Sequence, residues 1–372
     1  MVLTILVFIV MLSVLVLIHE LGHFLVAKKF GIRVEEFGFG FPPRVWGKRI
    51  GETIYSINLL PIGGFVKLYG EDEAGSGRVK PVANGKQPIA DLDRAFFARP
   101  IWQRFVVVIA GVAMNFLLAI VIISYVFSAE GVPSLGDKVI VTEVIKGSPS
   151  DVAGLKKGEV IYRINDEKIE STEELIGITR KSLGKEIRLG VGGEKIGEER
   201  EIKLIPREKY PADQGPMGVA VGQSIVVKKY PWYQAPFEGT KEVVKDSFLI
   251  IAGLGMVIRD LLSSGNVPQG VAGPVGIAQL TGEFVKTGPV AVLSFMALLS
   301  LNLAVLNILP IPALDGGRLF FIVLEAITRR KVNPKYEAYA HAVGIAVLLA
   351  LIAIITLHDF VRIFQGKPIF PQ

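Results

Sequence analysis

The chain contains long apolar stretches without a single charged side chain, and their lengths match the thickness of a membrane. A helix that crosses the hydrocarbon core needs about 20 such residues. Four stretches reach or approach this length: Met1–Ile18, Phe105–Ala129, Thr287–Leu314 and Ala338–Leu357. Each predicts a membrane-spanning helix. No Lys or Arg precedes the first stretch and no small-residue cleavage site follows it, which favours a retained helix over a signal peptide.

A fifth apolar run, Ser247–Ile258, is too short to cross a membrane and is bordered by charged residues. Lys245 and Asp246 precede it, and Arg259 and Asp260 follow it. Such a run between charges is typical of an interfacial or re-entrant helix. We therefore expect residues 230–276 to form an amphipathic interfacial segment.

Positive charges predict the orientation, because cytoplasmic connections are enriched in Lys and Arg. Two connections carry such residues, one after the first predicted span and one between the third and fourth: Lys28, Lys29, Arg33, Arg44, Lys48, Arg49, Arg94, Arg99 and Arg104 in the first, and Arg318, Arg329, Arg330, Lys331 and Lys335 in the second. Both connections are thus predicted to be cytoplasmic. Both termini, and the connection from about Glu130 to Asp260, then lie on the outer side.

The outer connection contains a segment with the pattern of a small folded domain. Residues from Lys138 to about Pro206 alternate short β-rich runs with Gly, Pro and Asn turns, and Ser171–Leu183 has the acidic first turn of a helix. The run S-P-S-D-V-A-G-L-K-K-G within Gly147–Ile161, followed by an Asn-Asp turn, resembles a PDZ domain. Such domains bind extended peptides by strand addition beside a helix. The alternative is a spacer domain without a ligand.

Composition excludes several classes of protein. The chain is 51% apolar and 20% charged, whereas soluble domains carry about 25% charged residues. Lys and Arg exceed Asp and Glu by only six and lie beside the apolar stretches, which argues against a nucleic-acid partner. The chain has no cysteine, so any metal must be bound by histidine and carboxylate.

Candidate catalytic residues lie at the inner end of the first predicted span, in the sequence His19-Glu20-Leu21-Gly22-His23. Two histidines four residues apart share one face of a helix, so both can bind a single ion, and the adjacent glutamate can contact a metal-bound water. Ionisable residues in a membrane helix are unfavourable by roughly 2.5 to 3.5 kcal/mol at its centre, which favours a functional role. The alternative is that these residues only mark the headgroup boundary.

A catalytic zinc normally has three protein ligands and one open position, so a third ligand is expected. His358 follows the fourth span and is predicted on the outer side, which excludes it. Asp315 is predicted at the inner end of the third span. Two prolines before it break the helix at membrane depth, where irregular backbone must line a cavity, and the glycines after it permit close approach. We favour Asp315, and His341 near the inner start of the fourth span remains the alternative ligand, or a buried packing residue.

The ordered motifs resemble the site-2 protease family of intramembrane zinc metalloproteases, in particular the bacterial regulator of sigma-E protease type. The resemblance rests on four features: H-E-L-G-H at His19–His23, N-x-L-P-I-P-x-L-D-G-G at Asn307–Gly317, G-P-V-G at Gly273–Gly276, and a PDZ-like module between the second and third spans. Two features depart from the family: there is room for one PDZ module only, and the second span lacks the proline expected after Gly111. The second departure is expected to affect only helix packing.

This resemblance implies one zinc ion per chain, bound by His19, His23 and Asp315, with Glu20 as the general base. It also points to Asn302 and Asn307 as polar residues near the site. Asn307 is expected to bind the substrate or the developing oxyanion, or only to stabilise the broken helix. The implied location is the bacterial cytoplasmic (inner) membrane, with the active site toward the cytoplasmic face and the PDZ domain outside.

Two short strand-like runs, Thr53–Leu60 and Gly64–Gly70, are joined by Pro61-Ile62-Gly63 and predict a β-hairpin. The resemblance implies that this hairpin is membrane-re-entrant and presents an extended substrate by strand addition. The alternative is an ordinary cytoplasmic hairpin. The Gly-rich stretch from Glu71 to about Pro88 predicts a mobile loop.

We therefore predict an α-helical polytopic membrane protein with four transmembrane helices, a re-entrant β-hairpin at about 53–70 and one inserted PDZ-like α+β domain. Residues 1–129 and 277–372 form the two halves of the membrane core, and residues 130–210 form the PDZ-like domain. The predicted activity is zinc-dependent hydrolysis of single-span membrane proteins, such as anti-sigma factors already trimmed by another protease, or signal-peptide remnants. The alternatives are a peptide-binding scaffold without catalysis and a metal transporter.

Overall fold

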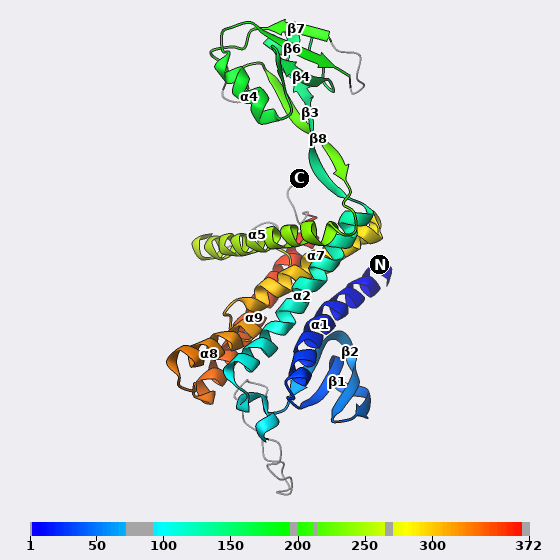
Figure 1. Cartoon of the computed structure of the whole chain (residues 1–372), viewed down its shortest axis with the longest axis vertical. Coiled ribbons are helices and arrows are strands. Elements are labelled where there is room, and N and C mark those ends of the chain that lie inside the picture. Colours follow the sequence, from blue (N-terminus) through cyan, green and yellow to red (C-terminus); the bar gives the residue numbers. More distant parts are fainter. Residues whose placement is uncertain (1, 72–91, 194–199, 212–213, 265–270, 367–372) are drawn as a thin grey trace. The chain divides into compact units, whose positions relative to one another are not determined.

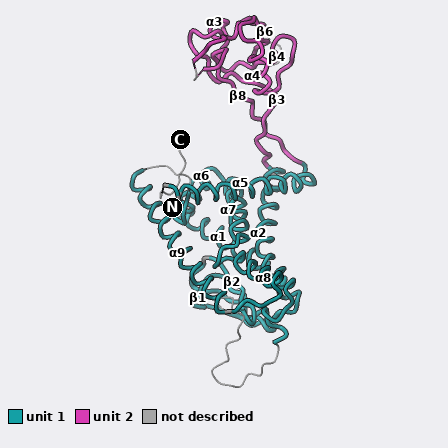
Figure 2. Tube along the Cα trace, turned by 90° about the vertical axis from the view of Figure 1, so that its left-hand side faces the viewer, with its two compact units in different colours: residues 1–129, 231–372 teal, residues 130–230 magenta. Residues whose placement is uncertain are grey.

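The computed structural model describes residues 2–71, 92–193, 200–211, 214–264 and 271–366, so that the loop predicted after Glu71 lies outside the described residues. The chain divides into two compact units, shown in different colours in Figure 2. One unit contains Met1–Ala129 and Pro231–Gln372, and the other contains Glu130–Tyr230. The segment inserted between the two parts of the membrane unit is thus a compact unit of its own.

Four helices of the first unit are long and apolar enough to cross a membrane: α1 Val2–Lys29, α2 Ile101–Ala129, α7 Pro289–Ile308 and α9 Pro334–Phe364. Among the described residues, these helices match the four stretches expected from the sequence. The polytopic membrane architecture is therefore confirmed.

The third span is shorter than its apolar stretch. Helix α7 ends at Ile308, and a new helix, α8, begins at Asp315 and runs to Thr328. Pro310 and Pro312 explain the break, because proline has no backbone N–H to donate and disfavours a helical residue before it. At Gly316 a side chain would clash with the returning backbone, since a Cβ atom would lie 1.8 Å from the Leu309 carbonyl oxygen. Asp315 is therefore the first residue of the next helix rather than the end of the third span.

Two further helices complete this unit, α5 Ala235–Ser264 and α6 Pro274–Thr287. Figure 1 shows α5 lying across the spanning helices rather than along them, and Val243 on α5 is buried with Ala119 on α2 and Leu301 on α7. Helix α6 begins at the G-P-V-G motif. The buried Asp359 carboxylate accepts the N–H groups of Gly273 (3.0 Å) and Gly276 (2.7 Å) and thereby caps α6 from the end of α9.

The predicted hairpin has a different strand order in the structure. One continuous strand, β2 (Thr53–Leu68), contains both predicted runs up to Leu68, and it pairs with a strand that was not predicted from the sequence, β1 (Val34–Ile50). Phe37 of β1 lies opposite both Tyr55 and Val66, so the first half of β1 lies between the two halves of β2. The predicted direct pairing of the two runs is therefore wrong. Two short 3₁₀ turns, Leu92–Arg94 and Phe96–Ala98, precede α2.

In its described residues, the second unit is an antiparallel sheet with two short helices. Its elements are β3 Val132–Val144, α3 Pro149–Val152, β4 Val160–Ile164, β5 Glu167–Lys168, α4 Thr172–Lys181, β6 Ile187–Gly192, β7 Arg200–Leu204 and β8 Val219–Lys228. The strand order is β7-β6-β4-β3-β8, with β5 paired to β4, and apolar side chains such as Ile161, Leu175 and Leu189 fill the core. The unit extends past the predicted end at residue 210, because β8 pairs with β3. The PDZ assignment stays a prediction.

Candidate metal centre

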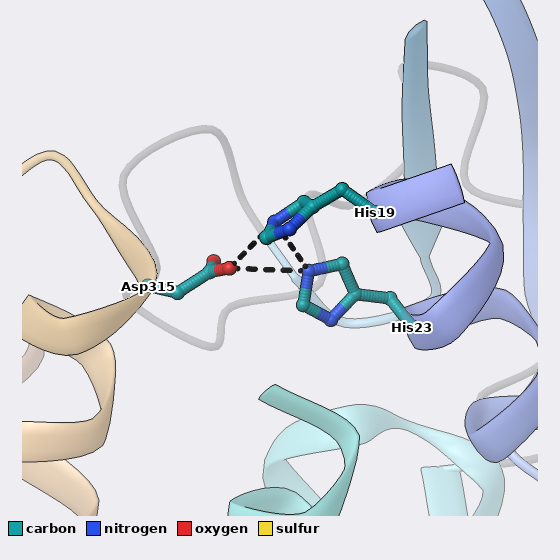
Figure 3. Close-up of side chains that lie close together, drawn as sticks. All are labelled: His19, His23 and Asp315. Atoms are coloured by element: carbon teal, nitrogen blue, oxygen red, sulfur yellow. Dashed lines mark hydrogen bonds and ion pairs between the residues drawn. The ribbon is translucent and has the colours of Figure 1, made fainter. Parts of the chain in front are cut away.

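Three side chains from two distant parts of the chain meet in the membrane unit. His19 and His23 are one helical turn apart on α1 and are 7% and 8% exposed, and Asp315 begins α8. The Asp315 Oδ2 atom lies 2.9 Å from Nε2 of His19 and 3.2 Å from Nε2 of His23, and the two Nε2 atoms are 3.2 Å apart (Figure 3). Their ligand atoms all lie within 4.8 Å of one another, so the three residues can bind one metal ion.

The donor set fits zinc. Two imidazole nitrogens and one carboxylate oxygen are among the ligand types zinc prefers, and three protein ligands leave a fourth position for water or substrate. Burial raises the pKa of the Asp315 carboxyl, but the two imidazoles outweigh burial and hold this pKa below its ordinary value. The ionised carboxylate is the form of this side chain that would bind a cation.

Helix α2 contacts both imidazoles. The Nδ1 atom of His23 donates a hydrogen bond to the Val107 carbonyl oxygen (2.8 Å), and the Asn115 amide lies 3.4 Å from Nδ1 of His19. At Gly111 a Cβ atom would lie 2.3 Å from Nε2 of His23. These α2 residues were not predicted from the sequence as part of the site, although their spacing of four places them on one face of the helix.

Glu20 lies beside the three converging residues and faces the β1–β2 sheet. Its Oε2 atom accepts the N–H of Val66 at 3.0 Å. Glu20, His23 and Asp315 line a cavity of ≈ 260 Å³ together with Val66 on β2, and Arg318 and His341 also line it. Glu20 therefore lies within reach of a group bound in this cavity.

The end of β2 is tied to α8 by charged groups. Arg318, in the first turn of α8, forms an ion pair with Glu71, and Glu71 also accepts the N–H of Leu68 at 3.4 Å. The N–H groups of Val66 and Leu68, near the end of β2, are therefore each hydrogen-bonded to a carboxylate.

The two asparagines expected near the site differ in what their side-chain amides contact. The Asn307 amide nitrogen lies 3.5 Å from Nε2 of His19, so Asn307 adjoins the ligand cluster. The Asn302 amide instead donates to the Leu298 carbonyl of its own helix at 3.0 Å. The role expected for Asn302 stays a prediction, because its side chain bonds within its own helix rather than to His19, His23 or Asp315.

The two histidines of α9 lie outside the metal-binding group. His341 uses Nδ1 to accept the N–H of Ala313 at 3.1 Å, and Ala313 has a left-handed backbone (φ 85°) within the break before Asp315. His341 therefore supports the loop that presents Asp315. His358 is seventeen residues farther along α9, about 25 Å at 1.5 Å per residue.

Comparisons with known proteins agree with this geometry. A family model described as peptidase family M50 matches residues 7–351. The zinc metalloprotease RasP of Geobacillus kaustophilus is 30% identical in an alignment that covers 96% of this chain and 97% of the relative. The regulator of sigma-W protease RasP of Bacillus subtilis is 30% identical in an alignment that covers 97% of this chain and 99% of the relative.

Proposed function

Because the chain belongs to peptidase family M50, the site-2 protease family of zinc metalloproteases, we propose that it cleaves single-span membrane proteins within or near their membrane segments. His19, His23 and Asp315 bind the zinc ion and Glu20 is the general base. The observation that carries this proposal is the convergence of the ligand atoms of His19, His23 and Asp315 in a bundle of membrane helices, beside a cavity that Glu20 lines with His23 and Asp315. The family assignment argues against the two alternatives, a scaffold without catalysis and a metal transporter.

Zinc held by such ligands would act as a Lewis acid and would lower the pKa of a bound water to about 7. Glu20 accepts the proton of the attacking water and returns it to the amine that leaves, since its carboxylate adjoins the ligands without being one of them. Asn307, whose amide lies 3.5 Å from Nε2 of His19, donates a hydrogen bond to the substrate carbonyl oxygen, where negative charge develops.

The substrate must be unwound before hydrolysis, because a helix buries its peptide bonds in its own hydrogen bonds. The edge of β2 at residues 64–68 supports strand addition as the way to hold an unwound segment. The N–H groups of Val66 and Leu68 point to carboxylates on this edge, and a carbonyl oxygen of an extended substrate can replace each carboxylate. The substrate backbone would then run along the cavity that Glu20 lines.

Substrate class and location are carried over from the relatives and the charge pattern. The Bacillus subtilis relative is named as a regulator of sigma-W protease, which supports anti-sigma factors as substrates here as well. Enrichment of Lys and Arg in two connections supports a bacterial cytoplasmic membrane location with the site toward the cytoplasm and residues 130–230 outside. The chain has no cysteine, so one cysteine at a time reports this orientation.

We expect Ser182→Cys to react with an impermeant maleimide added outside intact cells, and Lys48→Cys to react only after the membrane is opened. The reverse pattern would contradict the orientation.

The activity is tested with the purified full chain in lipid nanodiscs and a model single-span substrate. We expect one zinc per chain and cleavage that stops on chelation and returns with zinc. Glu20→Gln should retain zinc and lose cleavage, because the amide cannot accept the proton. Cleavage by Glu20→Gln at the wild-type rate would refute the assignment of the base.

A further inference from the structure

One face of α2 contacts the ligand histidines at three positions spaced by four residues. Val107, Gly111 and Asn115 lie along this face, because a helix turns through nearly one full turn in four residues. Val107 accepts the Nδ1 proton of His23, and Gly111 leaves room for both rings. Asn115 is the third contact and meets Nδ1 of His19.

The protonation of His19 follows from the direction of its ring. Its Nε2 atom points to Asp315 at 2.9 Å and to the other ligand nitrogen at 3.2 Å. A neutral imidazole that gives the Nε2 lone pair to a metal carries its proton on Nδ1. The Nδ1–H group of His19 is buried with the ring and needs an acceptor.

Asn115 is the neighbour that can provide this acceptor. Its side chain is fully buried, its amide nitrogen is 3.4 Å from Nδ1 of His19, and its amide oxygen has no hydrogen-bond partner in the described part of the chain. Two N–H donors cannot bond to each other. Rotating the amide by half a turn exchanges its oxygen and nitrogen, which differ little in shape, and makes the oxygen the atom facing Nδ1.

We propose that Asn115 is a positioning residue whose amide oxygen accepts the Nδ1 proton of His19 and thereby fixes the tautomer and ring orientation that direct Nε2 to the zinc ion. The proposal rests on the zinc site proposed above. The backbone of Asn115 is itself held, because Ser300 on α7 donates its hydroxyl to the Asn115 carbonyl oxygen at 2.9 Å. Helix α2 thus orients both ligand histidines, one with a backbone carbonyl and one with a side chain.

The first test compares zinc affinity in Asn115→Leu and Asn115→Asp. Leucine has a similar volume without an acceptor, and aspartate provides acceptor oxygens only. Losing such a partner weakens metal binding by about 10- to 100-fold, and we expect this loss for Asn115→Leu and wild-type affinity for Asn115→Asp. Ser124→Ala is the matched control, since Ser124 is a buried polar residue of α2 whose hydroxyl bonds its own helix at Ile120.

Zinc dissociation constants are measured on the full chain in nanodiscs by competition with a chelating indicator, and thermal unfolding of the metal-free protein monitors the fold. Wild-type affinity in Asn115→Leu would overturn the proposal. So would an Asn115→Asp variant that folds but binds zinc as weakly as Asn115→Leu. A wild-type chain that binds no zinc would instead overturn the zinc site itself.

A second readout needs no variant. The chain has four histidines, so the imidazole nitrogens of ¹⁵N-histidine-labelled, zinc-loaded protein can be assigned individually. We expect His19 to show a protonated Nδ1 and a metal-bound Nε2. A His19 ring bound to zinc through Nδ1 would overturn the proposal, whatever the variants do.

Discussion

Gly111→Ala tests directly how closely α2 lies against the two histidines of the candidate metal centre. A Cβ atom at this position would lie 2.3 Å from Nε2 and 2.6 Å from Cε1 of His23, and 2.8 Å from Cε1 of His19. Ordinary van der Waals contact begins near 3.4 Å, so the His23 ring must move by about 1.1 Å, or α1 must move away from α2.

One added methyl group at Gly111 is expected to have a large effect on zinc binding and on the cleavage rate. Ligand geometry has to be held within about 0.5 Å, and a misplacement of about 1 Å can lower a rate 10²-fold. We expect Gly111→Ala to weaken zinc binding at least tenfold and to lower cleavage of a model substrate about 10²-fold. Crowding a packed contact also lowers stability by about 1–3 kcal/mol.

Zinc affinity, cleavage rate and metal-free thermal unfolding are measured for Gly111→Ala beside Gly255→Ala. Gly255 lies in the interior of helix α5, where a Cβ atom would meet nothing within 4 Å. Replacing glycine by alanine raises helix propensity by the same amount in both variants, about 0.5–1 kcal/mol. The differences between the two variants in zinc affinity, cleavage rate and unfolding temperature therefore report the contact with the two imidazoles. If Gly111→Ala binds zinc and cleaves substrate as well as Gly255→Ala does, α1 and α2 do not approach each other as the structure indicates.

Further substitutions test the third ligand and its support. Asp315→Ala is expected to lower the zinc content strongly, and His358→Ala to leave it unchanged. Both are measured by metal analysis after gel filtration. Equal zinc content in wild type and Asp315→Ala would transfer the ligand role to another residue. His341→Phe removes the acceptor of the Ala313 N–H, which destabilises that loop by about 1–3 kcal/mol, whereas His341→Asn keeps an acceptor oxygen there. Unfolding temperatures and zinc affinities should therefore fall for the phenylalanine variant and recover for the asparagine variant, and identical values for the two would refute the supporting bond.

The spanning helices and the convergence of His19, His23 and Asp315 could be predicted from the sequence because each has a local signature. An uncharged apolar stretch of about 20 residues is rare except in membrane-spanning helices. The two histidines are marked by their spacing, and Asp315 by its place after two prolines and before two glycines. The Pro-rich break was predicted as well, but the end of α7 at Ile308 was not, because Leu309–Leu314 is as apolar as the helix before it.

The order of the small sheet could not be predicted from local pattern. The runs 53–60 and 64–70 have strand-like composition and a short turn between them, which favours direct pairing. In the structure residues 34–39 lie between them instead, and glycine makes this close packing feasible. A Cβ atom at Gly38 would lie 2.4 Å from the Phe65 ring, and one at Gly64 would lie 3.0 Å from the Gly38 carbonyl oxygen. The strand order thus depends on contacts between residues nearly thirty positions apart, which no local pattern encodes.

The contacts that α2 makes with His19 and His23 could not be predicted either, because they too depend on how distant segments pack. A carbonyl such as that of Val107 has no signature in a sequence, and a glycine or an asparagine in a membrane helix usually indicates packing. These residues acquire a role only through the register of α1 against α2, because a shift by one residue turns a helix face by about 100°. Gly22 helps to set that register, since a Cβ atom there would lie 2.4 Å from the Ala110 carbonyl oxygen, and Gly111 sets it from the opposite helix. The same close approach that packs the two helices therefore brings Val107 and Asn115 to the Nδ1 atoms of the ligand histidines, so that helix packing and ligand orientation cannot be varied independently.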